Sequence, residues 1–436
     1  MRSRFRKWLT PGIGIKRWLL LSVTGLLCFT LGILVLADVP ADFYSFLRAR
    51  VSIRATVGVF SILAGLVIMV VALYRWFGTI FAAVAPNEKK LLVDVLYERR
   101  QLEHGLKIVA IGGGTGLSCL LRGLKPYSSN LVAVVTVSDD GGSSGRLSKE
   151  LGVLPPGDIR NCLVSLADDE SLLSELFDYR FQDGHGLEGH SFGNLFLAAL
   201  TNMAGDFEEA IKMSSQILAT RGRVLPATLS TVTLCARYAD GSEVRGESAI
   251  PTAGKPIAEV YLDPPRCRPP AEVLEAIAQA DAIVMGPGSL FTSVIPNLMV
   301  DGIVEALLAT SAPKIYVCNV MTQPGESEGM GAADHLAALH QHAGAPVVDY
   351  ALVNIESPAQ VSLLNYKAHG ADTVAPQLAD LEALGVTPVA ASLVSADDLV
   401  RHDSTRLASA LIDLIARHKS REAAVAAAPR HLRAVK

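Results

Sequence analysis

Residues Lys107–Leu117 read KIVAIGGGTGL, and this stretch decides the fold of most of the 436-residue chain. Lys107–Ile111 is a short apolar run, as expected for a strand that is covered on both faces of a parallel sheet. The glycines after it allow the backbone to turn sharply, and a helix is expected from about Leu117 to Leu124. A strand, a glycine turn and a helix in this order are typical of an α/β fold.

The glycine turn is a candidate anion site. A helix start presents free N–H groups and the positive end of its dipole, so a phosphate is the natural guest. The expected ligand contacts are Gly112, Gly113, Gly114, Thr115 and Gly116. The turn lacks the last glycine of the dinucleotide fingerprint and the Gly-Lys-Ser/Thr of a P-loop. A purely structural turn is the alternative.

Strand-like and helical stretches alternate after this first unit. The expected strands are Leu131–Val137, Thr231–Tyr238, Ala282–Met285, Lys314–Asn319 and Tyr350–Asn354. The expected helices are Leu172–Phe177, Gly193–Ala204, Phe207–Leu218, Ala271–Gln279, Gly302–Leu308 and Ala332–Gln341. This alternation predicts an α/β, Rossmann-like doubly wound parallel sheet with helices on both faces. Ligands of such sheets bind outside the carboxyl ends of the strands.

A second glycine-rich loop, SDDGGSSGR, follows the second expected strand. An acidic side chain at that strand end can accept hydrogen bonds from ribose hydroxyls or hold a divalent cation. The glycines and serines offer main-chain donors, and the arginine offers a fork for phosphate. The candidate contacts are Ser138, Asp139, Asp140, Gly141, Ser143 and Arg146. A solvated turn is the alternative, since Asp-Gly is common in turns.

Two further motifs place polar side chains at expected helix starts. LPPGDIRN, residues 154–161, contributes Asp158 and Asn161, although an aspartate in such a turn often only caps a helix. GHSFGN, residues 189–194, contributes His190, Ser191 and Asn194. Hydrolysis by a serine–histidine pair is disfavoured, because adjacent side chains seldom point at each other and no Gly-x-Ser-x-Gly elbow surrounds the serine.

A third junction of strand and glycine loop occurs at MGPGSL, residues 285–290. It contributes Gly286, Pro287, Gly288 and Ser289, and the polar end of the next strand contributes Asn319. Because the carboxyl ends of parallel strands meet at one edge of a sheet, we expect these loops to share one pocket.

Two apolar runs precede this domain. Trp18–Ala37 contains no charge, and Ala55–Phe77 contains only Arg75. A bilayer core takes ~20 apolar residues, whereas the apolar region of a cleaved signal is shorter, about 7–15 residues. Lysines and arginines are richer outside the two runs than between them, which predicts a multi-pass plasma-membrane protein with both termini and the main domain cytoplasmic. A buried helical hairpin in a soluble protein is the alternative.

The composition agrees with a membrane-anchored chain. Hydrophobic residues make up 50%, and charged residues 19%, against roughly 25% in ordinary soluble domains. The net charge of −4 and the pI near 6.2 argue against nucleic acid as a partner. Six cysteines without a CxxC pair favour reduced, buried side chains over a zinc site.

These features divide the chain into four expected segments. Residues 1–85 form a membrane anchor that meets the lipid bilayer through residues 18–37 and 55–77. Residues 86–106 form a charged connecting helix, residues 107–418 the nucleotide-binding domain, and residues 419–436 a flexible basic tail.

Seven ordered motifs resemble one family closely. They are IGGGTG, VSDDGGSSGRL, PPGDIRN, GHSFGNLFLAAL, MGPGSLFTSVIPNLMV, CNVMTQPGES and ADHLAALHQH. Together they are similar to the YvcK-type gluconeogenesis factors, in the superfamily of 2-phospho-L-lactate transferase (CofD). The resemblance covers roughly Lys107 to Ala416. It leaves out the two apolar runs, a departure from a family whose members are mostly soluble.

The resemblance implies a Rossmann-like domain that binds a UDP-sugar such as UDP-N-acetylglucosamine, and it implies that Tyr366 and Arg401 help to hold this ligand. Such proteins act in carbon-source adaptation, cell shape and peptidoglycan supply. One hypothesis is therefore a non-catalytic regulator that senses the nucleotide sugar and signals to cell-envelope proteins, and this hypothesis includes a homo-oligomer. The other is a transferase of phosphorus-containing groups, with Mg²⁺ held by Asp139 or Asp140.

Overall fold

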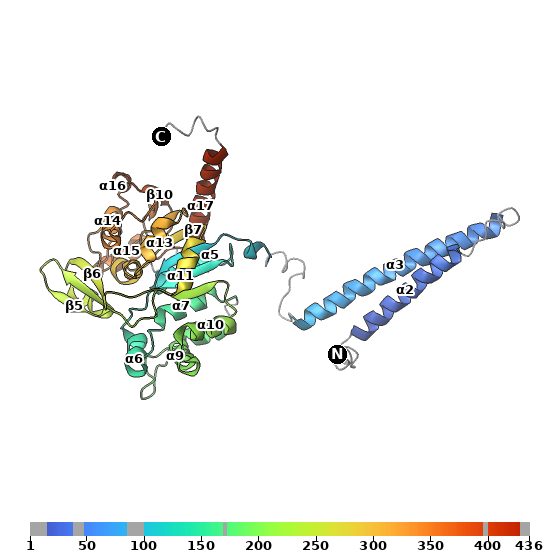
Figure 1. Cartoon of the computed structure of the whole chain (residues 1–436), viewed down its shortest axis with the longest axis horizontal. Coiled ribbons are helices and arrows are strands. Elements are labelled where there is room, and N and C mark those ends of the chain that lie inside the picture. Colours follow the sequence, from blue (N-terminus) through green and yellow to red (C-terminus); the bar gives the residue numbers. More distant parts are fainter. Residues whose placement is uncertain (1–14, 38–47, 85–99, 169–171, 396–399, 428–436) are drawn as a thin grey trace. The chain divides into compact units, whose positions relative to one another are not determined.

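The computed structural model describes residues 15–37, 48–84, 100–168, 172–395 and 400–427. The chain divides into two compact units, Met1–Glu98 and Arg99–Lys436. Figure 1 shows a long helical hairpin as the first unit and a layered α/β body as the second.

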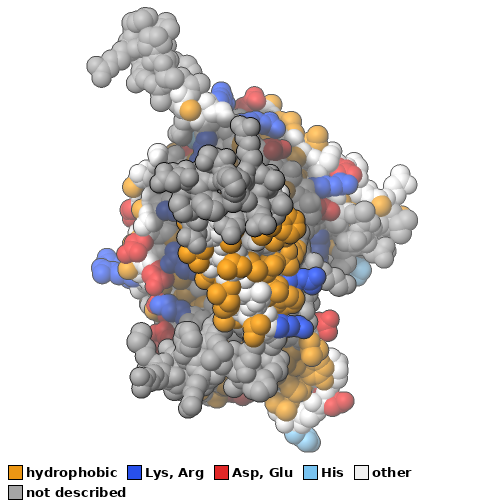
Figure 2. All heavy atoms as spheres, turned by 90° about the vertical axis from the view of Figure 1, so that its right-hand side faces the viewer, with side chains coloured by type: hydrophobic (Ala, Val, Ile, Leu, Met, Phe, Trp, Pro, Cys, Tyr) orange, Lys and Arg blue, Asp and Glu red, His pale blue; other side chains and the backbone are white. Residues whose placement is uncertain are grey.

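The first unit is an antiparallel pair of helices, α2 (Ile15–Ala37) and α3 (Arg48–Val84). Within them, Arg17–Ala37 and Ala55–Thr79 are long and apolar enough to cross a membrane. Most of their large apolar side chains are exposed, for example Leu20, Leu27 and Phe60. Apolar side chains cover most of the described hairpin surface in Figure 2, whereas charged side chains mark the second unit. The two predicted apolar helices are thus present.

Glycines allow the two hairpin helices to pack closely. A Cβ atom on Gly65 would lie 2.6 Å from the Gly25 carbonyl oxygen, and one on Gly32 would lie 2.8 Å from the Gly58 carbonyl oxygen. In each helix the two glycines are one heptad apart, so they recur on the same side. In an apolar solvent the hydrophobic effect does not drive helices together, and close van der Waals contacts at small residues of this kind do so instead.

The second unit is built on a seven-stranded parallel sheet in the order β10-β9-β8-β7-β1-β2-β3. The strands are β1 (Ile108–Gly112), β2 (Leu131–Val135), β3 (Arg223–Pro226), β7 (Ala282–Met285), β8 (Lys314–Val317), β9 (Tyr350–Asn354) and β10 (Thr387–Ala391). The first strand β1 lies between β2 and β7, so the chain fills the sheet outward in both directions from it. The predicted doubly wound parallel sheet is confirmed. Its topological switch point, where ligands of such sheets bind, lies between β1 and β7.

Helices cover both faces of this sheet. The helices are α5 (Gly114–Leu124), α6 (Gly142–Leu151), α7 (Gly157–Leu166), α8 (Leu172–Asp178), α9 (Phe192–Ala204), α10 (Phe207–Ile217), α11 (Ala271–Ala278), α12 (Ile295–Leu298), α13 (Ile303–Ala309), α14 (Ala332–Ala343), α15 (Gln360–Ala368), α16 (Leu378–Ala383) and α17 (Ser404–Ala427). The crossovers on the two sides of β1 run in opposite directions, so their shared right-handedness places their helices on opposite faces. Helix α5 packs against α7 and α17 on one of them.

A small antiparallel sheet is inserted between the two halves. Its strands β4 (Thr233–Tyr238), β5 (Glu243–Arg245) and β6 (Ile257–Asp263) pair in the order β5-β4-β6. The predicted strand at residues 231–238 is real, but its expected membership of the parallel sheet is wrong. Its neighbours in sequence form hairpin-like pairs with it, and this local pairing decides its place.

Two predicted segments differ from, or fall outside, what the structure describes. Most of the expected connecting helix, residues 86–106, lies outside the described residues, although residues 100–103 are helical. Helix α17 continues to Ala427, so residues 419–427 are helical where a flexible tail was expected. Lys419 Nζ lies 2.6 Å from Asp281 Oδ1, an ion pair that fastens this part of the helix to the start of β7.

The hairpin packing makes a direct prediction. Gly65→Leu forces α2 and α3 apart by about 2 Å or more, because a larger residue requires the ordinary ~8–10 Å interaxial distance. Spin labels at the exposed positions Leu27 and Leu63 report the separation by double electron–electron resonance in detergent. Gly78→Leu is the matched control, because nothing lies within 4 Å of a Cβ atom there. Equal label distances in both variants would contradict the close glycine packing.

Candidate functional site

Two main-chain turns meet at the switch point and line a cavity of about 430 Å³. One turn follows β1 and contributes residues 113–116, and the other follows β7 and contributes residues 287–289. The other lining residues are Cys119, Asp139, Asp158, Glu247, Ser293, Asn319, Val320, Met321, Gln323, Val400, Arg401 and His402. We call this space the glycine cavity. The structure thus brings together the first and third glycine motifs, as the sequence predicted.

Glycine is required in the first turn because other groups approach its backbone closely. A Cβ atom on Gly113 would lie 2.5 Å from Asp158 Oδ2, and one on Gly116 would lie 2.5 Å from the Pro287 carbonyl oxygen. Gly114 opens α5 with a φ of +65°, in the left-handed region that L side chains avoid. The bare backbone therefore lets the turn after β7 and the start of α7 pack directly against the start of α5.

The second turn is held by side chains from the next strand end. The Gly288 N–H donates to Asn319 Oδ1 (3.1 Å), and Asn319 Nδ2 donates back to the Gly288 carbonyl oxygen (2.8 Å). Gln323 Nε2 donates to Ser289 Oγ at 2.6 Å. Asn319 thus fixes the shape of the glycine loop after β7 while it lines the cavity.

Buried Asn297 ties the two halves together behind the turns. Its side-chain nitrogen donates to the Gly112 carbonyl oxygen (3.3 Å) and to the Ser293 carbonyl oxygen (2.7 Å). The Gly286 N–H donates to the Ile111 carbonyl oxygen at 2.9 Å. The predicted contacts Gly112 and Gly286 therefore do not line the cavity; they hold the strand ends that carry it.

Three carboxyl groups face the glycine cavity, those of Asp139, Asp158 and Glu247. Burial raises the pKa of Asp158 to about 6, and the nearby Asp139 carboxylate adds to the rise. Burial also raises the pKa of Glu247 to about 8, again with help from Asp139 and Asp158. Glu326 lies outside the cavity lining; burial raises its pKa to about 7, and its charge adds to the rise at Glu247. The groups crowd one another, so protons or a cation must offset their charge at neutral pH.

Glu247 is a cavity residue that sequence reasoning missed. It opens a short 3-10 turn, Glu247–Ala249, that follows β5 of the inserted sheet. Asp140 holds this turn, because its Oδ1 accepts a hydrogen bond from the Ser248 N–H at 2.9 Å. The predicted contact Asp140 therefore positions the insertion, while its neighbour Asp139 lines the cavity. The sequence around Glu247 carries no motif that marks it.

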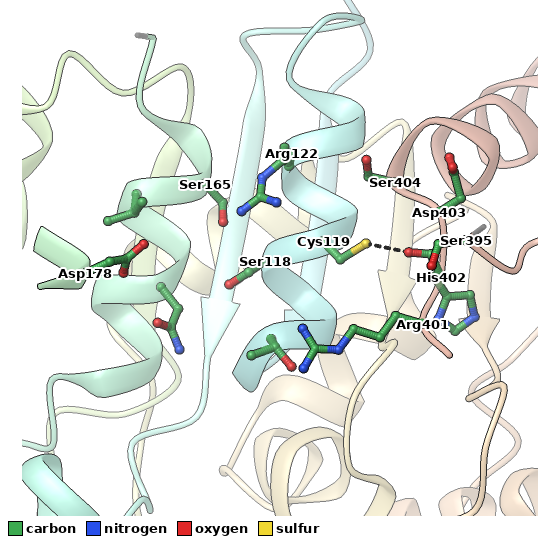
Figure 3. Close-up of a pocket in the computed structure, with 13 residues that line it drawn as sticks. Ser118, Cys119, Arg122, Ser165, Asp178, Ser395, Arg401, His402, Asp403 and Ser404 are labelled. Atoms are coloured by element: carbon green, nitrogen blue, oxygen red, sulfur yellow. Dashed lines mark hydrogen bonds between the residues drawn. The ribbon is translucent and has the colours of Figure 1, made fainter. Parts of the chain in front are cut away.

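A larger cavity of about 910 Å³ adjoins the first on the side of α5 (Figure 3). It shares Thr115, Cys119, Arg401 and His402 with the glycine cavity. Its further lining residues are Ser118, Arg122, Asn161, Val164, Ser165, Asp178, Ser395, Asp403 and Ser404. We call it the helix cavity. The predicted contacts Asn161 and Arg401 both line it.

The segment before α17 closes one side of both cavities. The Cys119 thiol donates to the His402 carbonyl oxygen at 3.1 Å, which joins α5 to this segment. Burial lowers the pKa of His402 to about 4, so its ring is neutral at physiological pH. Among the residues at the cavities, Arg401 thus supplies a lasting positive charge at their junction.

The GHSFGN motif, residues 189–194, contributes no residue to the lining of either cavity. His190, Ser191 and Asn194 are all buried. Arg160 Nη1 donates to Ser191 Oγ (2.5 Å) and to Asn194 Oδ1 (3.2 Å). These side chains line neither cavity, and they brace α7 against the start of α9.

The same buried network reaches the second glycine loop. His190 Nδ1 lies 2.9 Å from Ser143 Oγ, and Asn194 Nδ2 donates to Ser143 Oγ at 3.1 Å. These hydrogen bonds therefore hold the first turn of α6, directly after the loop that follows β2. The Gly141 N–H donates to Asp139 Oδ1 at 2.9 Å, which orients this carboxylate.

Three other predicted contacts lie outside the cavity linings. Buried Ser138 pairs with the Thr136 hydroxyl at 3.0 Å. Arg146 donates to the Glu188 carbonyl oxygen at 2.7 Å. Tyr366 packs against a small cluster that includes Val320 and Val400, two residues of the glycine cavity wall. Whether these and the cavity residues touch a ligand stays a prediction.

The comparisons with known proteins agree with this architecture. The family model described as 2-phospho-L-lactate transferase CofD matches residues 108–394. The chain belongs to the CofD family. Among its relatives are proteins named gluconeogenesis factor, which confirms the resemblance seen in the motifs.

The CofD-family relatives differ in how much of the chain they match. A putative gluconeogenesis factor from Nostoc sp. is 48% identical over 423 residues, which cover 94% of this chain and 92% of the relative. The gluconeogenesis factor of Bacillus subtilis is 48% identical over 310 residues, 71% of this chain and 98% of the relative. A solved structure of a UPF0052 family member from Bacillus halodurans superimposes with a TM-score of 0.68 at 48% identity and covers 70% of this chain and 99% of that chain.

These coverages separate the two units of the chain. A match over 94% of this chain cannot fit within Arg99–Lys436 alone, so the Nostoc relative also aligns with part of the first unit. The Bacillus subtilis and Bacillus halodurans proteins are matched over nearly their whole lengths by about 70% of this chain. The α/β unit is thus a complete fold in those relatives.

The crowded carboxyl groups predict a pH-dependent stability. Glu247 ordinarily titrates at 4.5, so above pH 6.5 the unfolded chain has lost this proton, whereas the folded chain holds it until about pH 8. Glu247 therefore lowers stability as pH rises from 6.5 to 8. At the lower end of this window Glu326, with a folded pKa of about 7, adds to the fall, and His402, which ordinarily titrates at 6.5 and in the fold at about 4, opposes it. We expect the melting temperature of the ligand-free protein to fall by a few degrees over this range.

The measurement is thermal unfolding between pH 6.5 and 8, with Glu247→Gln as the test variant. The amide cannot ionise, so the slope should flatten. Glu275→Gln, at an exposed position of α11, is the matched control and should keep the wild-type slope. A slope in Glu247→Gln as steep as that of the wild type would remove Glu247 as its source.

Proposed function

We propose that the α/β unit binds a nucleotide sugar of the UDP-N-acetylglucosamine type and acts as a regulatory protein. The observation that carries the proposal is the meeting of two glycine turns and Arg401 around one cavity at the switch point. The relatives named gluconeogenesis factors support a role in carbon metabolism. Roles in carbon-source adaptation, cell shape and peptidoglycan supply belong to this proposal.

The main-chain donors and the charge at the cavity favour a diphosphate. The start of the eleven-residue helix α5 brings the N–H groups of residues 114–116 to the cavity, where the Gly114 N–H donates to the Asp158 carboxylate. An anion there is favoured by the helix dipole, and Arg401 can add charge-assisted hydrogen bonds from the other wall. Asp139, after β2, stands where doubly wound folds place an acidic residue for ribose hydroxyls.

The hairpin supports a membrane-anchored form of this regulator. Its two helices can each cross a bilayer, and its outward side chains are apolar. The flanking lysines and arginines favour the plasma membrane with both termini and the α/β unit in the cytoplasm. A sensor of nucleotide sugars would then stand beside the machinery that uses them.

A Mg²⁺-dependent transferase is the second candidate, and the carboxylates of the glycine cavity favour it. Protein Mg²⁺ sites often use one or two carboxylates, substrate phosphates and waters. Asp139 and Asp158 line the cavity beside the glycine turn and could supply such ligands, whereas Asp140 points to the inserted sheet. Within the described residues there is no ready cage of three or more metal-ligating side chains.

One experiment separates the two functions. The full chain in detergent is titrated calorimetrically with UDP-N-acetylglucosamine and with UDP, with and without Mg²⁺. The same mixtures are then analysed by mass spectrometry for products. Tight binding without turnover supports the regulator. A transfer product supports the transferase, and no heat with any nucleotide would overturn both.

Arg401 and Gly114 give the sharpest variants for this proposal. Arg401→Ala should weaken UDP-sugar binding by about 10- to 100-fold, because a hydrogen bond to a charged group contributes about 1.5–3 kcal/mol. Gly114→Val should abolish binding, since a branched side chain strains the positive φ and enters the anion site. Arg417→Ala, at an exposed position of α17, is the control for lost charge.

Tyr366→Ala tests the residue carried over from the family. It should weaken UDP-sugar binding while the circular dichroism spectrum stays that of the wild type, because Tyr366 packs against the wall of the glycine cavity. Unchanged affinity in a folded variant would remove Tyr366 from the ligand site and leave the glycine cavity intact.

A further inference from the structure

The helix cavity has a regular origin in the sequence. Along α5 it is lined by Thr115, Ser118, Cys119 and Arg122, which share one helical face at spacings of three and four residues. A matching set, Asn161, Val164 and Ser165, lines it from α7. In Figure 3 these two helices flank the space, and residues 401–404 stand on the far side of α5. Polar faces on two packed helices create a pocket where apolar faces would have closed it.

The lining of the helix cavity indicates what kind of group it holds. Hydroxyl groups predominate, from Thr115, Ser118, Ser165, Ser395 and Ser404. No aromatic side chain is among the described residues that line it, so it offers no stacking surface for a nucleobase. Such a wall fits a compact group that carries many hydroxyls.

The lining of the helix cavity carries charges of both signs. Arg122 and Arg401 stand with Asp178 and Asp403, and Asp178 Oδ1 also lies 3.8 Å from Nε of Arg160, a residue outside the lining. An apolar acyl chain would leave these charged side chains desolvated. A neutral, hydroxylated group can instead accept hydrogen bonds from the guanidinium groups and donate to the carboxylates.

The residues that the two cavities share indicate where each part of a bound nucleotide sugar would lie. Thr115, at the start of α5, lines both, and Arg401 faces both. A diphosphate at the α5 start would therefore lie at the junction. With the ribose directed to Asp139 in the glycine cavity, the group on the other side of the diphosphate must leave toward the helix cavity.

We propose that the helix cavity is the sugar subsite, which holds the hexose of a nucleotide sugar while the glycine cavity holds the nucleoside diphosphate. The inference rests on the proposed function. It assigns specificity for the sugar to the facing sides of α5 and α7, with Asn161 and Asp178 as the hydrogen-bonding side chains from the α7–α8 wall.

Val164→Trp tests the subsite by filling it. Val164 is a partly buried apolar residue that lines the helix cavity and not the glycine cavity. The full chain in detergent is titrated with UDP-N-acetylglucosamine and with UDP. The variant should lose about tenfold or more in affinity for the nucleotide sugar and keep its affinity for UDP. Leu384→Trp, at an exposed position outside both cavities, is the matched control for an added indole.

The outcomes separate this inference from the function on which it rests. If the wild type binds neither UDP nor the nucleotide sugar, the proposed function fails. If the wild type binds both and Val164→Trp weakens both equally, or neither, the sugar subsite fails while the nucleotide site stands.

Asp178→Asn is the second variant, in case the tryptophan prevents folding. Asp178 is an exposed residue at the end of α8 and its Oδ1 lies 3.8 Å from Arg160 Nε, so the melting temperature of the variant is compared with that of the wild type. It should weaken binding of UDP-N-acetylglucosamine and leave UDP unaffected. Equal affinities of wild type and variant for both ligands would argue against the assignment of Asp178 to the sugar.

Discussion

The close approach of two bare main-chain turns is the constraint on which the rest of this structure depends. The start of α5 can lie against the turn after β7 only because Gly116 leaves room for the Pro287 carbonyl. The same is true of Gly113 and the carboxylate of Asp158. The buried Asn297 side-chain nitrogen donates to the Gly112 and Ser293 carbonyl oxygens. Separation of the two halves of the sheet would leave these buried polar groups unpaired.

The electrostatics of the glycine cavity follow from that packing. Bare amides and a helix start favour an anion, yet three carboxyl groups line the same space. The pKa of Glu247, raised to about 8, keeps this carboxyl protonated at neutral pH, whereas Asp158, with a pKa of about 6, is largely ionised there. A polyanion can enter only with protons or a cation that offset the carboxylates. In the proposed regulator, protons would offset the negative charge of these carboxylates. In the alternative transferase, Mg²⁺ would do so.

Much of the scaffold was predictable from the sequence because parallel strands leave a local signal. Ala282–Met285 and Tyr350–Asn354 were predicted with the bounds that the structure shows, since continuous apolar runs beside turn residues mark buried strands. Glu247 was missed because it reaches the cavity from an inserted sheet, and no local pattern reports that fold-back. His190 and Asn194 look like ligand contacts in sequence, but burial assigns them to the support of the loop after β2.

Glycine serves the same physical purpose, close packing of main chain, in both units of the chain. In the hairpin, glycines at heptad spacing let two apolar helices pack closely against each other. In the α/β unit, glycines bring two main-chain turns together at the sheet edge, where the Gly114 N–H donates to Asp158 and the Gly288 N–H donates to Asn319. Away from its ends, a hairpin helix satisfies its backbone groups internally, whereas the first amides of α5 have no partners within their own helix. The second arrangement brings these amides to the glycine cavity, which is why the proposed anion site lies in the α/β unit.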